Sequence, residues 1–324
     1  MRESSLLLHI YGQNAALPAR VSLPPGDDMG AVRFDPGGGG DAEVLVAVDQ
    51  LADGVHVDVA HTSLSQVGRK AVTRNLSDVA AMAAVPLAAV VAACLPRDFG
   101  QTRAEALFDS LRRAAAAFDC PLIGGDIAMW DHPLLLSVTV LARPEAGIAP
   151  VKRSGAAGGD LLYVTGRLGG SLIELHGYTH HLDFEPRLHV ARRLATVCRP
   201  SAMIDLSDGL AADLPRLLAA SGDLVGEIEL AQLPISEAAQ LAAERSGRPS
   251  WQHAVGDGED YELLFTVDPA QTQRHLPESI EGVPVTRIGR VRKRLQPDEP
   301  PLLLMDEEGQ VRPLDSTGWE HTGT

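Results

Sequence analysis

Acidic residues interrupt or end several apolar segments of this 324-residue chain. The tripeptide Leu-Ser-Asp occurs twice, at 76–78 and 206–208, each time between apolar residues. A second acid, Asp205, stands beside the later copy, and further acids follow glycine or end a hydrophobic run. The full set is Asp27, Asp28, Asp49, Asp78, Asp126, Asp205, Asp208, Glu259 and Asp260.

A convergent group of such carboxylates would indicate magnesium-dependent phosphoryl chemistry. Like charges within about 4–6 Å disfavour each other's ionisation, and a divalent cation removes that penalty. Mg²⁺ prefers oxygen ligands and is usually held by one or two carboxylates together with substrate phosphates. Taken singly, each aspartate is more typical of a helix cap or a turn. The metal hypothesis therefore depends on their number and on their positions at element ends.

The elements that would carry these acids follow from hydrophobic periodicity. Residues 43–51 alternate and are rich in Val, which predicts a strand ending at Asp49. Residues 63–83 repeat apolar side chains at three- and four-residue steps, which predicts a helix. On that helix Lys70, Arg74 and Asp78 form a polar stripe, with Asn75 on the adjoining row. The stripe fits a solvated helix face as well as it fits the wall of a site.

Further along, the pattern predicts a strand near 87–94, a helix near 102–118 and a short strand that runs into Gly124, Gly125 and Asp126. Paired glycines let a backbone approach a ligand closely. The Gly/Ala-rich stretch at 149–160 predicts a boundary between domains 1–148 and 149–324.

In the second half we predict helices near 170–177 and 186–197, followed by a strand, an Asp-Gly turn and a helix over 201–221. This arrangement places Asp205 at a strand end and Asp208 at a helix start, where ligands bind in α/β folds.

Histidines offer a rival metal site. His176, His180 and His181 have a spacing that could hold zinc, but no further partner of suitable spacing stands out. His56 follows the strand that ends at Asp49, so it is a candidate for the same site.

Composition excludes several classes of function. A formal net charge of −15 is unlike the basic surface that nucleic acid or an anionic membrane requires. The three cysteines are widely separated, which favours a reducing cytoplasm over a disulfide framework. The longest uncharged run, 79–96, contains Pro86 and is shorter than the roughly 20 residues of a membrane span.

The chain resembles the thiamine-monophosphate kinases of the aminoimidazole-ribonucleotide-synthetase-like superfamily. The resemblance covers about residues 20–270 and the GWEH near the C-terminus. Its motifs, in family order, are PPGDDMGAV, VDQLADGVHV, GRKAVTRNLSDVAAMAA, LIGGD, KRSGAAGGDLLYVTGRLG, MIDLSDGLAADL and GDGEDYELLFTV.

This resemblance implies an α/β fold of two domains. The N-terminal domain would bind ATP and magnesium, and its sheet would pair with that of a second subunit to close a barrel in a homodimer. The implied reaction is direct transfer of a phosphoryl group from ATP to thiamine monophosphate, giving thiamine diphosphate, with several Mg²⁺ ions and no covalent nucleophile. Such a site works by positioning and charge neutralisation.

The resemblance also assigns roles to individual residues. His56, Glu259 and Trp319 match positions that contact the thiamine phosphate, whereas Lys70 and Asn75 lie in a matching motif without an assigned role. The positions matching the ATP-binding set are Gly125, Asp126, Arg153 and Ser207. The positions matching magnesium ligands are Asp28, Asp49, Asp78, Asp126, Asp205 and Asp208.

Four residues depart from the family pattern and put the number of bound ions in question. Ala47 and Val48 replace hydroxyl residues before the strand-end Asp49, Ile127 replaces a threonine, and Asp257 replaces a glycine. Two alternatives therefore stay open: a non-catalytic thiamine-phosphate or nucleotide binder, and another ATP-dependent enzyme of the same superfamily. Against the latter, no cysteine precedes Cys94 and the chain does not end in cysteine.

Overall fold

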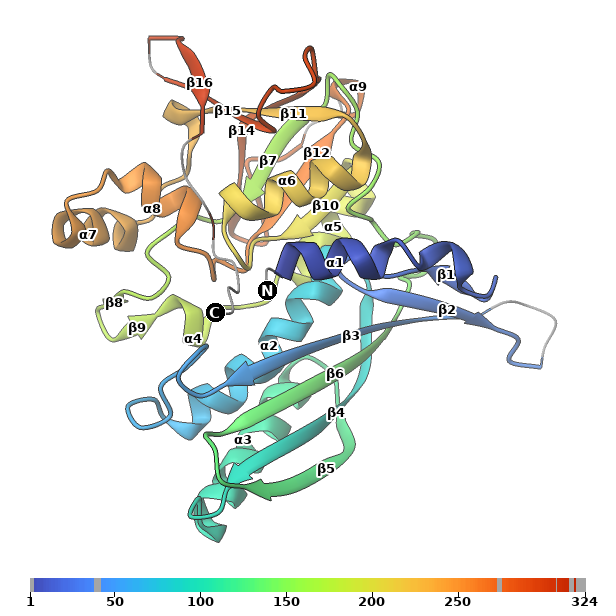
Figure 1. Cartoon of the computed structure of the whole chain (residues 1–324), viewed down its shortest axis with the longest axis vertical. Helices are drawn as coiled ribbons and strands as arrows, with labels where there is room; N and C mark the ends of the chain where they lie inside the picture. The colour runs from blue at the N-terminus through green and yellow to red at the C-terminus, as the bar shows by residue number, and fades with distance from the viewer. Residues whose placement is uncertain (1–2, 38–41, 273–275, 307, 315–317, 319–324) are drawn as a thin grey trace.

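The computed structural model describes residues 3–37, 42–272, 276–306, 308–314 and 318. Two β-sheets, one from each half of the chain, dominate the arrangement (Figure 1). Every helix in these described ranges is too short or too polar to cross a bilayer. The location in a reducing cytoplasm stays a prediction.

The first sheet has six strands in the order β1-β2-β3-β6-β4-β5. Its strands are β1 (Val21–Leu23), β2 (Gly30–Phe34), β3 (Ala42–Ala52), β4 (Val85–Pro96), β5 (Leu122–Trp130) and β6 (Leu135–Arg143). The helices of this half are α1 (Glu3–Tyr11), η1 (Asn14–Ala16), α2 (Leu64–Ala81) and α3 (Gln101–Ala117). β4 and β5 are parallel and the other neighbours antiparallel. A parallel pair needs a long crossover, which α3 supplies.

Helices α2 and α3 lie together over one face of the first sheet (Figure 1). α2 begins at its N-cap Ser63, whose hydroxyl accepts a hydrogen bond from the Gln66 amide. At Gly68 a Cβ atom would overlap Ser110 of α3, so glycine permits the close approach of the two helices. α2 is thereby fixed between the sheet and α3.

The far edge of this sheet is bare. All seven residues from 123 to 129 of β5 are exposed, including Ile123, Ile127 and Met129. Val48 on β3 is 63% exposed. Exposed apolar edge strands are unusual in a monomer and mark a site of association.

The second sheet has eight strands in the order β10-β12-β7-β14-β11-β15-β16, with β13 paired to β14. They are β7 (Leu161–Thr165), β10 (Ala202–Asp205), β11 (Leu224–Glu229), β12 (Leu263–Val267), β13 (Ser279–Ile280), β14 (Val283–Lys293), β15 (Leu302–Met305) and β16 (Val311–Pro313). Around it are α4 (His180–Asp183), α5 (Leu188–Val197), α6 (Leu210–Ser221), η2 (Leu230–Gln232), α7 (Glu237–Ser246), α8 (Ser250–Gly256) and α9 (Pro269–Thr272).

Strands β10 and β12 of the second sheet are buried on both faces. On β12, Leu264 joins the core that includes Leu214 of α6, whereas Phe265 joins the core that includes Leu76 of α2 and Leu194 of α5. The core that contains Phe265 includes residues from both sides of residue 148, because α5 packs on α2. The division into domains 1–148 and 149–324 therefore stays a prediction.

Two expectations about local structure are wrong. The helix expected near 170–177 is instead a loop and a small hairpin of β8 (Glu174–Leu175) and β9 (Tyr178–Thr179). Gly169, Gly170 and Gly177 have φ between +73° and +84°, which a right-handed helix cannot contain. The short strand expected to run into Gly124, Gly125 and Asp126 instead continues through these residues to Trp130. At Gly125 a Cβ atom would overlap the Val91 carbonyl, so that glycine serves strand pairing.

Candidate active site

Three carboxylates from three separate elements meet between the two sheets. Asp28 lies in the loop between β1 and β2, Asp78 on α2, and Asp205 at the end of β10. One oxygen from each lies within 4.8 Å of the others. We call Asp28, Asp78 and Asp205 the acidic triad. Within the described ranges, it is the one group of three or more acidic, histidine or cysteine residues that could hold a metal ion.

The chemistry of the triad fits a divalent cation. Burial first, and then the neighbouring carboxylates, raise the pKa of Asp78 well above its ordinary value and that of Asp205 to about 7. Asp28 Oδ2 is buried and has no hydrogen-bond partner among the described residues. Three oxygens that repel one another, one of them unsatisfied, are suitable ligands for magnesium.

Two neighbours hold the triad in place. The Arg153 guanidinium donates to Asp28 Oδ1 at 2.7 Å from Nη2 and 3.2 Å from Nε. The Ser77 hydroxyl donates to Asp205 Oδ2 at 2.6 Å. Arg153, in the loop between β6 and β7, contacts Asp28 of the first half, and Ser77 on α2 contacts Asp205 of the second half. The triad therefore depends on contacts across the halves of the chain.

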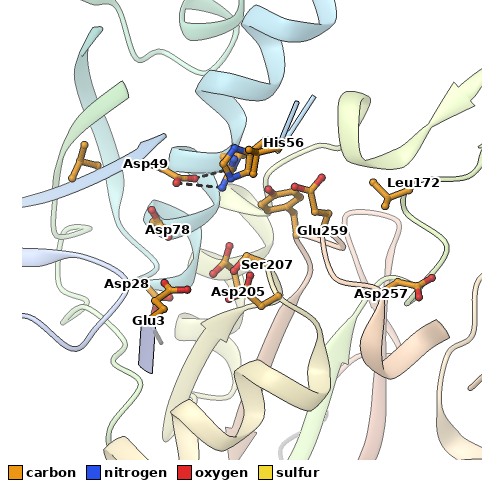
Figure 2. A pocket seen from close by; sticks show the side chains of 15 residues that line it. Glu3, Asp28, Asp49, His56, Asp78, Leu172, Asp205, Ser207, Asp257 and Glu259 are labelled. Atoms are coloured by element: carbon orange, nitrogen blue, oxygen red, sulfur yellow. Dashed lines mark hydrogen bonds and ion pairs between the residues drawn. The ribbon is translucent and has the colours of Figure 1, made fainter. Parts of the chain in front are cut away.

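A cavity of about 350 Å³ opens beside the triad (Figure 2). Leu172 and Tyr261 are among its lining residues, although the sequence did not indicate them as site residues. Arg74 of the polar stripe also lines it. The sequence-predicted residues that line the cavity are Asp28, Asp49, His56, Asp78, Asp205, Ser207, Asp208 and Glu259.

Asp49 and Asp208 line the cavity but are paired with arginines. Asp49 Oδ2 lies 2.8 Å from Nε of Arg74, and Asp208 Oδ2 accepts from Nη1 of Arg216 at 2.5 Å. Both acids lie outside the triad. Their role as metal ligands stays a prediction.

Gly125 and Asp126 are placed elsewhere. Both lie on β5, at the bare edge of the first sheet, and neither is among the cavity-lining residues (Figure 1). Trp319 lies outside the described residues. Within a single chain, the structure therefore does not bring Gly125 or Asp126 to the triad.

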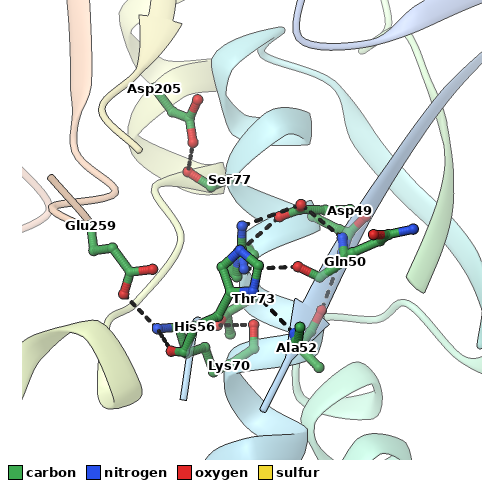
Figure 3. Close-up of polar contacts among 12 residues, drawn as sticks. Asp49, Gln50, Ala52, His56, Lys70, Thr73, Ser77, Asp205 and Glu259 are labelled. Carbon is green, nitrogen blue, oxygen red and sulfur yellow. Dashed lines mark hydrogen bonds and ion pairs between the residues drawn. The ribbon is translucent and has the colours of Figure 1, made fainter. Parts of the chain in front are cut away.

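The polar stripe of α2 faces the protein interior. Lys70 is completely buried, and the Arg74 side chain is 12% exposed. The solvated-face interpretation is thus wrong, because β3 and the turn that carries Glu259 cover this side of α2. Lys70 Nζ lies 2.5 Å from Glu259 Oε2 and 2.6 Å from the His56 carbonyl oxygen (Figure 3).

Glu259 has an unusual setting. Its φ of +56° and that of Tyr261, +49°, are left-handed, and the Glu259 amide donates to the Ser207 carbonyl at 2.7 Å. Burial alone would raise the Glu259 pKa, but contacts with His181 and Lys70 lower it to about 2. Glu259 therefore presents a carboxylate to the cavity.

The zinc alternative finds no support in the described residues. His181 Nδ1 lies 2.7 Å from Lys70 Nζ, whereas His180 Nε2 contacts the Asp260 carbonyl oxygen at 2.6 Å. The two rings have different partners and converge on no common point with His176. No sequence signal indicated that His181 would reach Lys70, because the two are 111 residues apart.

The four departures from the family pattern leave the triad intact. Ala47 is buried in the core, and Ile127 is exposed on β5. Asp257 accepts from the Gly170 amide at 3.1 Å and lies 2.9 Å from His253 Nδ1, so it stabilises the loop beside the hairpin.

Comparison with known proteins agrees with this geometry. Residues 26–143 match the family described as AIR synthase related protein, N-terminal domain. The chain is 41% identical to the thiamine-monophosphate kinase of Rhodopirellula baltica over 293 residues, which cover 89% of each chain. A solved structure, AaThiL complexed with AMPPCP and TMP, matches with a TM-score of 0.79 at 27% identity over 99% of each chain. The thiamine-monophosphate kinase of Stenotrophomonas maltophilia matches with a TM-score of 0.69 at 30% identity over 95% of this chain and 97% of that one. The chain belongs to the thiamine-monophosphate kinase family.

Proposed function

We propose that this protein transfers the γ-phosphoryl group of ATP to thiamine monophosphate, forming thiamine diphosphate. The observation that carries the proposal is the acidic triad, with its unpartnered buried oxygen, in the wall of a cavity that also exposes Glu259. Bound magnesium would neutralise the charge of phosphate oxygens there.

The two sides of the cavity suit different substrates. Arg153 and Ser207 lie beside the triad, and we assign them to ATP because a guanidinium matches phosphate oxygens in geometry and charge. His56 and Glu259 lie farther along the cavity, and we assign them to thiamine monophosphate (Figure 2). These residues bind and orient the reactants, and none is needed as a covalent nucleophile.

A homodimer is part of the proposal. The exposed β5 carries Gly125 and Asp126, which the single chain leaves far from the cavity. A second copy seated on β5 would cover its apolar side chains and could bring Asp126 to a neighbouring site. We also keep Asp49, Asp208 and Trp319 in the site of the substrate-loaded dimer, as the family motifs imply.

The test is a direct product assay. Purified protein is incubated with ATP, thiamine monophosphate and Mg²⁺, and the products are separated by chromatography. We expect thiamine diphosphate to form, and chelation of Mg²⁺ to abolish it. Absence of product over a wide range of magnesium concentration would refute the kinase proposal. Binding of both ligands without turnover would favour the non-catalytic alternative.

A further inference from the structure

Lys70 is a buried ammonium with three polar contacts. It lies on α2, eight residues or about two turns before Asp78. Its Nζ lies 2.6 Å from the His56 carbonyl oxygen and 2.5 Å from Glu259 Oε2 (Figure 3). The third contact, at 2.7 Å, is to His181 Nδ1. A lysine ammonium has three N–H donors. The number of contacts equals the number of donors, and all three partners belong to the protein.

His181 Nδ1 faces both members of the Lys70–Glu259 ion pair. It lies 2.7 Å from Lys70 Nζ and 3.0 Å from Glu259 Oε2. The side chain of His181 is 13% exposed, whereas Lys70 is completely shielded. His181 thus lies between the Lys70 ammonium and solvent.

Lys70 fixes both residues that we assign to the acceptor substrate. Oε2 of Glu259 is held by Lys70 at 2.5 Å. His56 is held by its carbonyl oxygen, and its ring Nδ1 accepts from the Ala52 amide at 3.0 Å. His56 and Glu259 are 203 positions apart in the printed sequence, yet they share this one cation.

We propose that Lys70 and His181 are positioning residues for the acceptor side of the site. They hold the Glu259 carboxylate and the His56 loop in one geometry without touching the substrate. The inference rests on the function proposed above. Loss of Lys70 or His181 should change ATP binding little. Arg153 is held by Asp28, and Asp205 of the triad is held by Ser77, so neither depends on Lys70 or His181.

The test compares the affinities of the two ligands in a set of variants. Calorimetry measures the Kd of thiamine monophosphate, with Mg²⁺ present, and separately the Kd of a non-hydrolysable ATP analogue with Mg²⁺. For Lys70→Met we expect thiamine monophosphate to bind at least about tenfold more weakly, a change of about 1.4 kcal/mol. The Kd of the ATP analogue should change less than about twofold.

His181 supplies a second, milder test. His181→Ala removes the ring nitrogen that contacts both Lys70 and Glu259 and should weaken thiamine monophosphate binding several-fold. His181→Asn places an amide group, which can both donate and accept, where Nδ1 stood, so it should restore binding to within about twofold of wild type. A purely structural loss of packing would not show this rescue.

Arg69 provides the matched control. It precedes Lys70 on α2 and also reaches the other half of the chain, where it donates to the Phe184 carbonyl oxygen at 3.0 Å and to Glu185 at 2.9 Å. It does not contact Glu259 or His56. Arg69→Ala should leave both Kd values within about twofold of wild type.

Several outcomes would overturn the proposal. A folded Lys70→Met protein that binds thiamine monophosphate as wild type does, or that loses both ligands equally, contradicts it. If Lys70→Met does not fold, equal binding by His181→Ala and wild type contradicts it instead. Wild type that binds thiamine monophosphate but forms no product refutes the kinase proposal alone. Wild type that does not bind thiamine monophosphate refutes both.

Discussion

Without a bound cation, the fold disfavours the ionised form of Asp205. Its pKa of about 7 in the fold lies above its ordinary value of 3.8, chiefly because of burial and the nearby charge of Asp28. A raised carboxyl pKa means that the fold favours the protonated form. The contribution of Asp205 to stability is therefore present below pH 3.8 and is lost as the pH rises to about 7.

Replacing Asp205 should make the metal-free protein less sensitive to pH. One proton corresponds to a slope of up to about 1.4 kcal/mol per pH unit in the free energy of unfolding. For Asp205→Asn we expect much of this slope between pH 5 and 7 to disappear, as measured by urea denaturation in EDTA. At pH 7 the variant should be at least as stable as wild type.

The same variant should lose the response to ligand. Mg²⁺ with a non-hydrolysable ATP analogue stabilises the native state by mass action only where the ions bind. We expect the thermal shift of wild type to shrink in Asp205→Asn and in Asp78→Asn. A structural acid would give the opposite pattern, with a lower melting temperature without ligand and an undiminished shift.

Arg153 should matter for ATP more than for thiamine monophosphate. Its guanidinium contacts Asp28 of the triad, whereas the adjacent Lys152 is exposed. For Arg153→Ala we expect the Kd of the ATP analogue to rise about tenfold or more, in line with charge-assisted hydrogen bonds of about 1.5–3 kcal/mol. Lys152→Ala is the control. Calorimetric titrations in which thiamine monophosphate is the more affected ligand would reverse our assignment.

Among the elements, α2 contributes most to the site. It carries Lys70, Arg74, Ser77 and Asp78, and its position depends on Gly68 against α3. In an isolated helix, alanine in place of glycine would stabilise by roughly 1 kcal/mol. Here the added Cβ would overlap Ser110 and approach the Leu111 amide. Backbone atoms cannot move aside easily.

We therefore expect Gly68→Ala to destabilise the protein by about 1–3 kcal/mol, the usual cost of an overpacked core. Denaturant unfolding measures this change. Activity should fall as well, because α2 holds one ligand of the triad and the Lys70 contacts. An unchanged or raised midpoint would show that α3 shifts without cost.

Periodicity and turn chemistry were enough to predict the strand at 43–51, α2 and the strand-to-helix step that carries Asp205. These elements have long, regular apolar patterns. The hairpin at 174–179 was missed because Gly177, and Gly169 and Gly170 before it, adopt positive φ in a segment with helix-like composition. The Lys70–His181 contact could not be predicted, since it depends on how two distant segments pack. Likewise, the residues around Asp126 did not predict that it would lie on an edge strand, because strand order depends on how distant segments pair.

For the molecule as a whole, the exposed β5 predicts association. Ile127 is 58% exposed at the sheet edge, and its replacement by Asp should disfavour a dimer that buries β5. Sedimentation analysis should find wild type as a dimer and Ile127→Asp as a monomer with strongly reduced turnover. Leu295 is 77% exposed after β14, so Leu295→Asp is the control and should stay dimeric. A wild-type monomer with full activity would exclude the shared site.

The turn that carries Glu259 has a consequence for how this protein could adapt. Glu259 and Tyr261 both hold left-handed backbone conformations, which cost an L-residue other than glycine roughly 1–2 kcal/mol each. Glycine at position 259 would relieve that cost and remove the carboxylate that faces the cavity. Selection for heat resistance alone would therefore favour changes at this turn that selection for turnover opposes. Variants evolved without substrate should therefore acquire substitutions at this turn early.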